Sequence, residues 1–128
     1  NMHFVNSHFM HPDDLLDEDR GAALGWEKLR ARLDEYMTWM NESAPSLRNL
    51  TGSELAGAVQ RYGALTVDKE ITDQEIRIHL GNFYDEAYLM VRINDGTPGQ
   101  VTGGELTNVT GNLYLLHAQE SEVVIERN

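Results

Sequence analysis

The chain has 128 residues, no cysteine and a formal net charge of -11 at pH 7, from 21 acidic and 10 basic side chains. The lack of cysteine excludes disulfide bonds, thiolate metal ligands and a cysteine nucleophile. The acidic surplus argues against nucleic acid as a partner, because such binding depends on clustered Lys and Arg, and no apolar run is long enough for membrane insertion. With a hydrophobic share of 41%, we expect a folded, soluble chain.

The N-terminal stretch holds three of the five histidines: His3, His8 and His11. Residues 3 to 10 are rich in Phe, Val and Met, which predicts a short buried strand that ends near Pro12, since proline lacks a backbone donor. Because strand-like residues begin almost at once, we expect the chain to be cut from a longer protein. An acidic loop follows up to about residue 25.

Two helices are predicted after this loop. From Trp26, apolar residues recur at spacings of three and four, which predicts an amphipathic helix to about Asn41. The segment Thr51-Gly52-Ser53-Glu54 has the form of a capping box, in which the first and fourth residues satisfy each other's backbone donors. A second helix should therefore begin there and close near Gly63.

Beyond residue 63 the apolar period changes to two, which predicts strands. We expect a hairpin that turns at Thr72-Asp73-Gln74, a strand over residues 87–94, and a long turn where glycines cluster between residues 96 and 104. Three further strands are predicted over residues 106–110, 113–118 and 123–126.

These elements predict an α+β fold: a short N-terminal strand and loop, two helices, then an antiparallel β-sandwich-like module of about six strands. The domain boundaries that we predict separate a His/Asp-rich head at residues 1–24, a two-helix connector at 25–63 and a C-terminal β-module at 64–128.

The head is the best candidate for chemistry. His8 and His11 are three residues apart, with Asp13 and Asp14 close behind, and imidazole with carboxylate suits zinc and similar ions. On a strand, residues three apart point to opposite faces, so one shared ion requires the backbone to turn before Pro12. The alternative is structural: a histidine makes one hydrogen bond, and an aspartate caps the following turn.

The string His11-Pro12-Asp13-Asp14 resembles the signature of the LmbE-like (PIG-L) N-acetylglucosamine deacetylases. In that family the His and the second Asp bind zinc, and the first Asp acts as a base. The match covers four residues. Those enzymes usually have a Glu directly after the motif and a Rossmann-like domain beyond it, whereas Leu15 and a helix-then-strand pattern follow here, so this family is set aside.

A second resemblance covers most of the chain. The order of the segments looks like the C-terminal part of bacterial glycoside hydrolase/deacetylase-type β/α-barrel proteins, large secreted polysaccharide-deacetylase-like proteins of uncharacterised type. The matching residues are His8-Phe9-Met10-His11-Pro12-Asp13-Asp14, Asp17-Glu18-Asp19-Arg20-Gly21, Trp26 and Leu47-Arg48-Asn49-Leu50-Thr51-Gly52-Ser53-Glu54, before the closing β-module.

This resemblance implies that the head lies beside the mouth of a barrel and that the β-module is an accessory domain. The predicted catalytic residues are His11, Asp13 and Asp14, and the predicted metal ligands are His8 and His11, for a divalent metal such as zinc in the full-length protein. The barrel and its His-x-x-x-His metal motif are missing from this sequence, so the fragment alone should be inactive. The parent should be secreted or at the cell surface.

Two further features of the sequence bear on function: the acidic loop and the aromatic residues. The acidic loop lacks the Gly and the Glu that an EF-hand needs at its sixth and twelfth positions, so we expect a solvated loop. A platform for sugar rings could be formed by the aromatic residues Trp39, Phe83, Tyr84, Tyr88 and Tyr114, although such residues more often pack the core. Tyr84 and Tyr88 are the predicted carbohydrate-binding residues.

We therefore predict a C-terminal fragment of a carbohydrate-active, polysaccharide deacetylase-like protein, with polysaccharide or the protein's own catalytic domain as its partner. The alternative is a non-catalytic module that binds carbohydrate or a neighbouring domain, in which the histidine cluster is structural.

Overall fold

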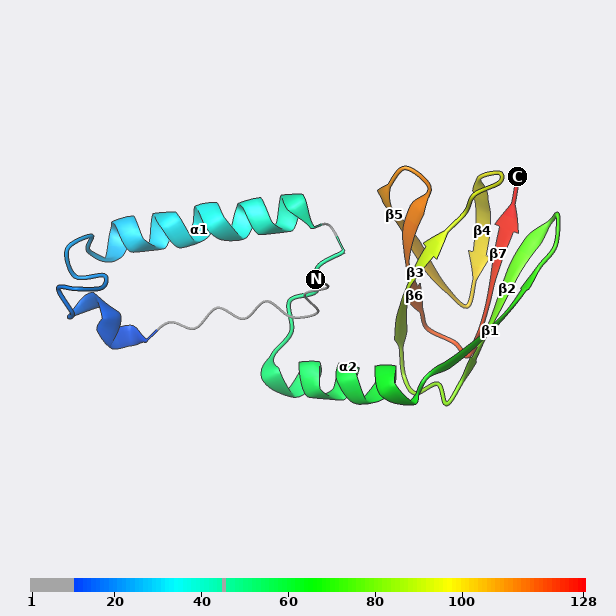
Figure 1. The fold of residues 1–128 in the computed structure, drawn as a ribbon, viewed down its shortest axis with the longest axis horizontal. Coiled ribbons are helices and arrows are strands. Elements are labelled where there is room, and N and C mark those ends of the chain that lie inside the picture. The colour runs from blue at the N-terminus through cyan, green and yellow to red at the C-terminus, as the bar shows by residue number, and fades with distance from the viewer. Residues whose placement is uncertain (1–10, 45) are drawn as a thin grey trace. The chain divides into compact units, whose positions relative to one another are not determined.

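A computed structural model describes residues 11–44 and 46–128, which belong to two compact units, Asn1–Pro45 and Ser46–Asn128 (Figure 1). The strand predicted for residues 3–10 lies outside the described residues. Within the described residues, no helix combines the length and the apolar character needed to cross a membrane.

The first unit holds a short 3-10 helix, η1 (Pro12–Leu15), and one long helix, α1 (Trp26–Ser43). The predicted amphipathic helix is confirmed, and it runs two residues further than expected. Its apolar stripe is half-buried at Leu29, Leu33 and Tyr36, and no residue of α1 is fully buried.

The second unit begins with a loop and the helix α2 (Gly52–Ala64), whose predicted capping box is confirmed. The Thr51 N–H donates to the Glu54 carboxylate at 2.7 Å, and the Glu54 N–H donates to the Thr51 hydroxyl at 3.4 Å. These hydrogen bonds, led by the one from the Thr51 backbone, lower the pKa of Glu54 because they favour its charged form. The cap thus fixes where the chain enters α2.

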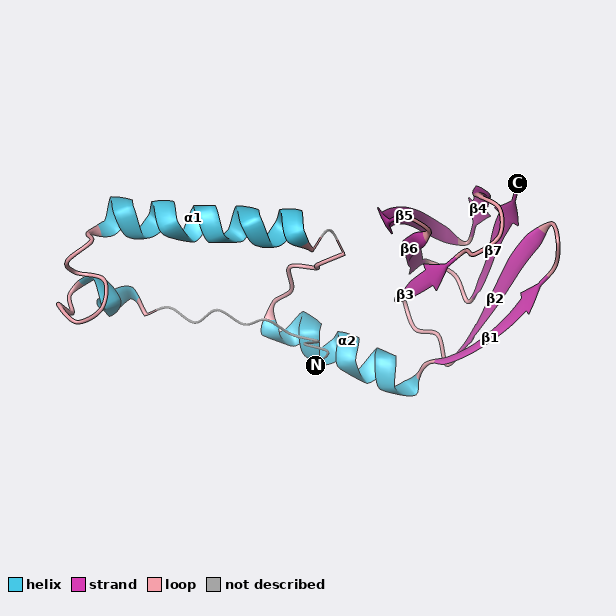
Figure 2. Cartoon of the chain, turned by 45° about the horizontal axis from the view of Figure 1, so that its top comes forward, coloured by secondary structure: helices cyan, strands magenta, loops and turns pink. Residues whose placement is uncertain are grey.

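Seven antiparallel strands follow α2 and form two sheets (Figure 2). They are β1 (Thr66–Ile71), β2 (Glu75–Gly81), β3 (Ala87–Arg92), β4 (Pro98–Thr102), β5 (Gly104–Thr110), β6 (Leu113–Ala118) and β7 (Glu122–Arg127). The first sheet has the strand order β1-β2-β7-β4, and the second has the order β3-β6-β5. The predicted α+β fold with a sandwich-like β-module is confirmed.

The long turn predicted between residues 96 and 104 is wrong, because this stretch contains β4. β4 pairs with β7, and its Val101 packs against the core. Only Gly103 separates β4 from β5, so the chain passes from one sheet to the other within a single residue. Its φ of 80° is a left-handed value that glycine adopts without strain.

The core lies between the two sheets and follows the alternation of the strands. Its buried side chains come mainly from the central strands; they are Ile76, Ile78, Leu80, Ala87, Ile93, Leu116, Ala118, Val123 and Ile125. The connections between the sheets are short, so β4 faces β5, β7 faces β6 and β2 faces β3 across the core.

Candidate functional site

The predicted catalytic residues of the head lie in and just before η1. His11 Nδ1 is 3.7 Å from Asp13 Oδ1, and both side chains are more than half exposed. The His11 N–H donates to the Asp14 carboxylate at 3.1 Å. The predicted ligand His8 lies outside the described residues. The head therefore brings His11 and the two aspartates together within a single turn.

Asp14 is the most constrained of these residues. Its carboxylate is bonded to the guanidinium of Arg20, and the Gly21 N–H donates to its backbone carbonyl at 2.9 Å. The pKa of Asp14 is lowered, first by the hydrogen bond from Arg20 and then by the one from the His11 backbone, because both favour the charged form. This carboxylate serves to close the acidic loop.

Replacing Arg20 by Ala should raise the pKa of Asp14 toward its ordinary value. Because the folded-state pKa lies below the unfolded one, the Asp14 contribution to stability is present above the unfolded value and is lost as pH falls through the folded value. The variant should therefore lose less stability on acidification than the parent. Carbon-detected NMR titration of the Asp14 carboxyl measures this shift. Arg30→Ala, which removes a partner of Asp34 in α1, should leave that titration unchanged.

The described residues contain no group of three or more His, Cys, Asp or Glu side chains placed to hold a metal ion. His11 and Asp13 offer two ligands, and Arg20 already occupies the Asp14 carboxylate. A catalytic zinc site uses three protein ligands. The described part of the head therefore does not fit a zinc ion by itself.

A second cluster lies in the β-sandwich unit, around the connection between β2 and β3. Asn82 and Asp85 in this connection both take positive φ values, 55° and 67°. The side chain of Asn82 donates to the carbonyl oxygen of Ala64 at 3.1 Å, which satisfies a backbone group at the end of α2. The connection is therefore fastened to the helix.

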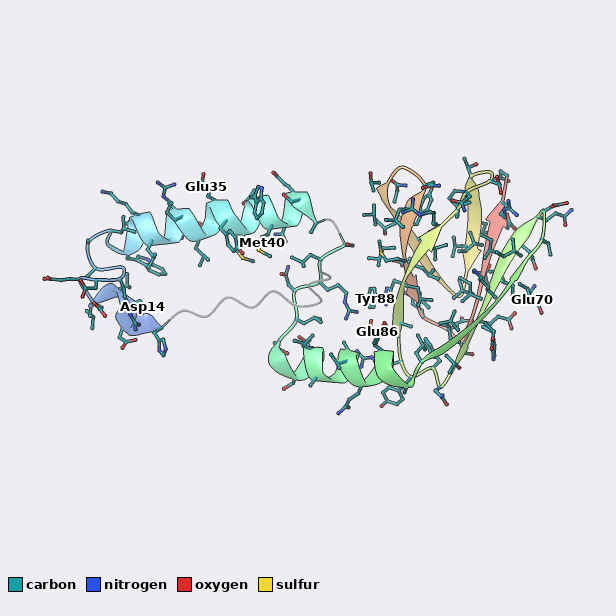
Figure 3. All side chains as sticks on the ribbon, in the orientation of Figure 1. Asp14, Glu35, Met40, Glu70, Glu86 and Tyr88 are labelled. Carbon is teal, nitrogen blue, oxygen red and sulfur yellow. The ribbon has the colours of Figure 1, made fainter. Side chains whose placement is uncertain are left out.

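Glu86 is the centre of this cluster (Figure 3). Its Oε1 atom lies 3.6 Å from the guanidinium of Arg48 and 3.4 Å from that of Arg61, and its Oε2 atom lies 3.0 Å from His117 Nε2. All four side chains are between 26% and 30% exposed, so the carboxylate and the two guanidiniums are paired and partly shielded from water. We call these four residues and Tyr88 the Glu86 cluster.

Tyr88 joins the cluster from β3, where it pairs with His117 on β6. The two rings are stacked, with centroids 4.4 Å apart and an interplanar angle of 6°. The guanidinium carbon of Arg48 lies 3.8 Å from the centroid of the Tyr88 ring, which is a cation–π contact. Tyr88 thus orients Arg48 and His117 in the cluster.

Tyr84 lies two residues before Glu86 and is 73% exposed. The Glu86 N–H donates to the Tyr84 carbonyl at 2.8 Å across Asp85, whose φ is 67°. This bond and this φ are those of the rare γ-turn with a positive central φ. Such strained turns occur where side chains must be held in fixed directions. The turn therefore fixes the backbone between Glu86 and Tyr84, whose side chain is exposed to solvent.

The other three aromatic residues of the predicted sugar platform lie elsewhere in the structure. Phe83 and Tyr114 pack against the core of the sandwich. Trp39 is 61% exposed and belongs to α1, where its ring lies 6.1 Å from that of Tyr36. Of the two predicted tyrosines, Tyr88 is therefore a member of the Glu86 cluster, and Tyr84 is joined to Glu86 through the backbone.

Sequence reasoning did not find four members of the cluster: Arg48, Arg61, Glu86 and His117. They come from a loop, a helix, a connection and a strand, and they are up to 69 positions apart by residue number. The one local signal is His117, a polar residue in the otherwise apolar strand β6.

The family model described as "Uncharacterised protein conserved in bacteria (DUF2194)" matches residues 1–115 of the chain. No curated protein and no solved structure matches the chain.

Proposed function

We propose that this chain, which belongs to the DUF2194 family of bacterial proteins, is the accessory part of a carbohydrate-active, polysaccharide deacetylase-like protein. In this proposal the β-sandwich binds polysaccharide at Tyr84, and Tyr88, whose ring is stacked on His117 and contacts Arg48, positions the neighbouring polar groups. The observation that supports it is the γ-turn that joins the exposed residue Tyr84 to Glu86, the centre of the cluster.

An exposed tyrosine ring suits a pyranose, because the flat apolar face of the sugar stacks on the ring while its hydroxyls need hydrogen-bond partners. The Glu86 cluster offers such partners: a carboxylate that accepts, and two guanidiniums that donate. Tyr88 contributes by holding the Arg48 guanidinium in place. Because these side chains are already paired with one another, binding of a sugar immobilises few additional side chains and so loses little conformational entropy.

The first test is a glycan array, with acetylated and deacetylated polysaccharides, probed with the natural chain and two variants. Tyr84→Ala should bind any polysaccharide that the array identifies at least about tenfold more weakly, a loss of about 1.4 kcal/mol. Tyr62→Ala is the matched control, since Tyr62 is 74% exposed but lies on α2. Equal binding by the two variants contradicts a role for Tyr84.

For the head, we propose that it forms one wall of the active site of a larger parent, secreted or at the cell surface. His8 and His11 are the ligands that the head would offer to a divalent ion such as zinc, with further ligands from elsewhere in the parent. Calorimetric titration of this chain with zinc should give a heat of binding that a His8→Ala/His11→Ala variant lacks. Equal heats from both proteins contradict a role for these histidines in metal binding.

A non-catalytic structural module is the second candidate. One observation favours it: the Glu86 cluster joins a loop, α2, the β2–β3 connection and β6 of the same unit, as a stabilising ion-pair network would. Absence of binding to every glycan of the array would support this candidate over the first.

A further inference from the structure

The two sheets of the sandwich differ by one strand. The sheet with β1 has four strands and the other has three. Since β2 faces β3, β7 faces β6 and β4 faces β5, no strand of the described residues lies opposite β1. Figure 2 shows β1 at the margin of its sheet, beyond β2. One strand position, beside β3 and opposite β1, is therefore open.

The inner side of β1 carries side chains suited to a covered position. Val67, Lys69 and Ile71 are paired with Leu80, Ile78 and Ile76 of β2, and paired residues point to the same side of a sheet. The partners on β2 are buried, whereas Val67 is 47% exposed and Ile71 is 58% exposed. Two apolar side chains thus face the open position, with one lysine between them.

The edges of the sheets differ in how they are protected against pairing. β1 carries Asp68, Lys69 and Glu70, and β4 starts at Pro98; the registers of β4 and β5 also contain irregularities. Charges, proline and bulges are the usual means of blocking an edge strand. β3, with the sequence Ala-Tyr-Leu-Met-Val-Arg, has none of these before its last residue. Within the described residues, β3 pairs only with β6.

We propose that the edge of β3 accepts one extended strand from a partner protein, which lies over β1 and completes a sandwich of four strands in each sheet. The free backbone groups of β3 specify an extended peptide, as in other cases of strand addition. The inner face of β1 specifies the side chains of this peptide: apolar residues opposite Val67 and Ile71, and an acidic residue between them opposite Lys69.

The β3 strand of a second copy does not fit the same position. If the β3 strands of two copies paired, the β2 strand that covers β3 in the second copy would occupy the place of β1 in the first. A single strand has no such covering layer. The geometry therefore favours a segment of another protein.

The probe is a blocked peptide, Thr-Val-Thr-Glu-Thr-Val-Thr, whose sequence reads the same in both directions and so does not depend on strand polarity. A second peptide carries Lys in place of Glu. The natural chain should bind the Glu peptide at least about tenfold more tightly, and Lys69→Glu should reverse this preference. Glu70→Lys, which changes a charge on the opposite face of β1, is the control and should keep the natural preference. Hydrogen exchange should show new protection in β3.

Weak affinity of a short peptide is addressed by fusing each peptide to Asn128 through a long Gly/Ser linker, which raises its effective concentration to roughly the millimolar range. The matched fusion should raise the melting temperature, and the mismatched fusion should not. If matched and mismatched fusions melt at the same temperature and β3 gains no protection, the open position does not accept a strand and the proposal is wrong.

Discussion

Replacing Leu116 by Ala should lower the free energy of unfolding of the sandwich by about 3 kcal/mol. Leu116 lies on β6, the central strand of the three-stranded sheet, and its side chain is 0% exposed. The change removes buried apolar surface and leaves a cavity between Leu89 and Leu106, which pair with Leu116 on either side. Urea denaturation followed by circular dichroism measures the loss.

The matched control is Met90→Ala on the neighbouring strand β3. Met90 pairs with Leu115 and so points to the outer side of the same sheet, where it is 52% exposed. The free energy of unfolding of this variant should fall by less than about 1 kcal/mol, because the substitution removes less buried apolar surface. Equal losses from the two variants would mean that the core does not lie between the sheets.

Replacing Gly103 by Ala should cost about 3 kcal/mol of stability, the second large effect that we expect. A Cβ atom at Gly103 would lie 2.1 Å from the carbonyl oxygen of Glu122, and the φ of 80° is strained for any residue with a side chain. The Gly103 carbonyl also accepts hydrogen bonds from the N–H groups of Gln119 and Glu120. The transfer of the chain between the sheets therefore depends on this glycine.

Gly111→Ala separates the two causes of this loss. Gly111 also has a positive φ, 53°, but a Cβ atom there would meet nothing within 4 Å. Its replacement should cost about 1 kcal/mol, the backbone contribution alone. If thermal denaturation gives the same loss for both glycines, the close approach to Glu122 is not what requires Gly103.

The fold could be predicted from sequence where local patterns match the final structure. The spacing of apolar residues after Trp26 marks α1, the capping box from Thr51 marks α2, and the period of two marks most strands. β4 was missed because it is an edge strand with Pro98 and Gly99 at its start and one core residue, Val101. Such a strand is defined by its pairing with β7, which no local pattern records.

The candidate site was less predictable than the fold. The head was found because His11, Asp13 and Asp14 are adjacent in the sequence, and the structure keeps them in one turn. The Glu86 cluster depends on the pairing of β3 with β6 and on where α2 ends. These are long-range features, so residues as ordinary in sequence as Arg61 and Glu86 carry no signal of their own.

The most direct test of carbohydrate binding is an NMR titration of the isotope-labelled chain with the polysaccharide that the array selects. We predict that the largest shifts affect the amides of residues 82–88 and the ring of Tyr84, with smaller shifts at His117. Shifts confined to other surfaces, or no shifts at saturating polysaccharide, would contradict the proposed binding site.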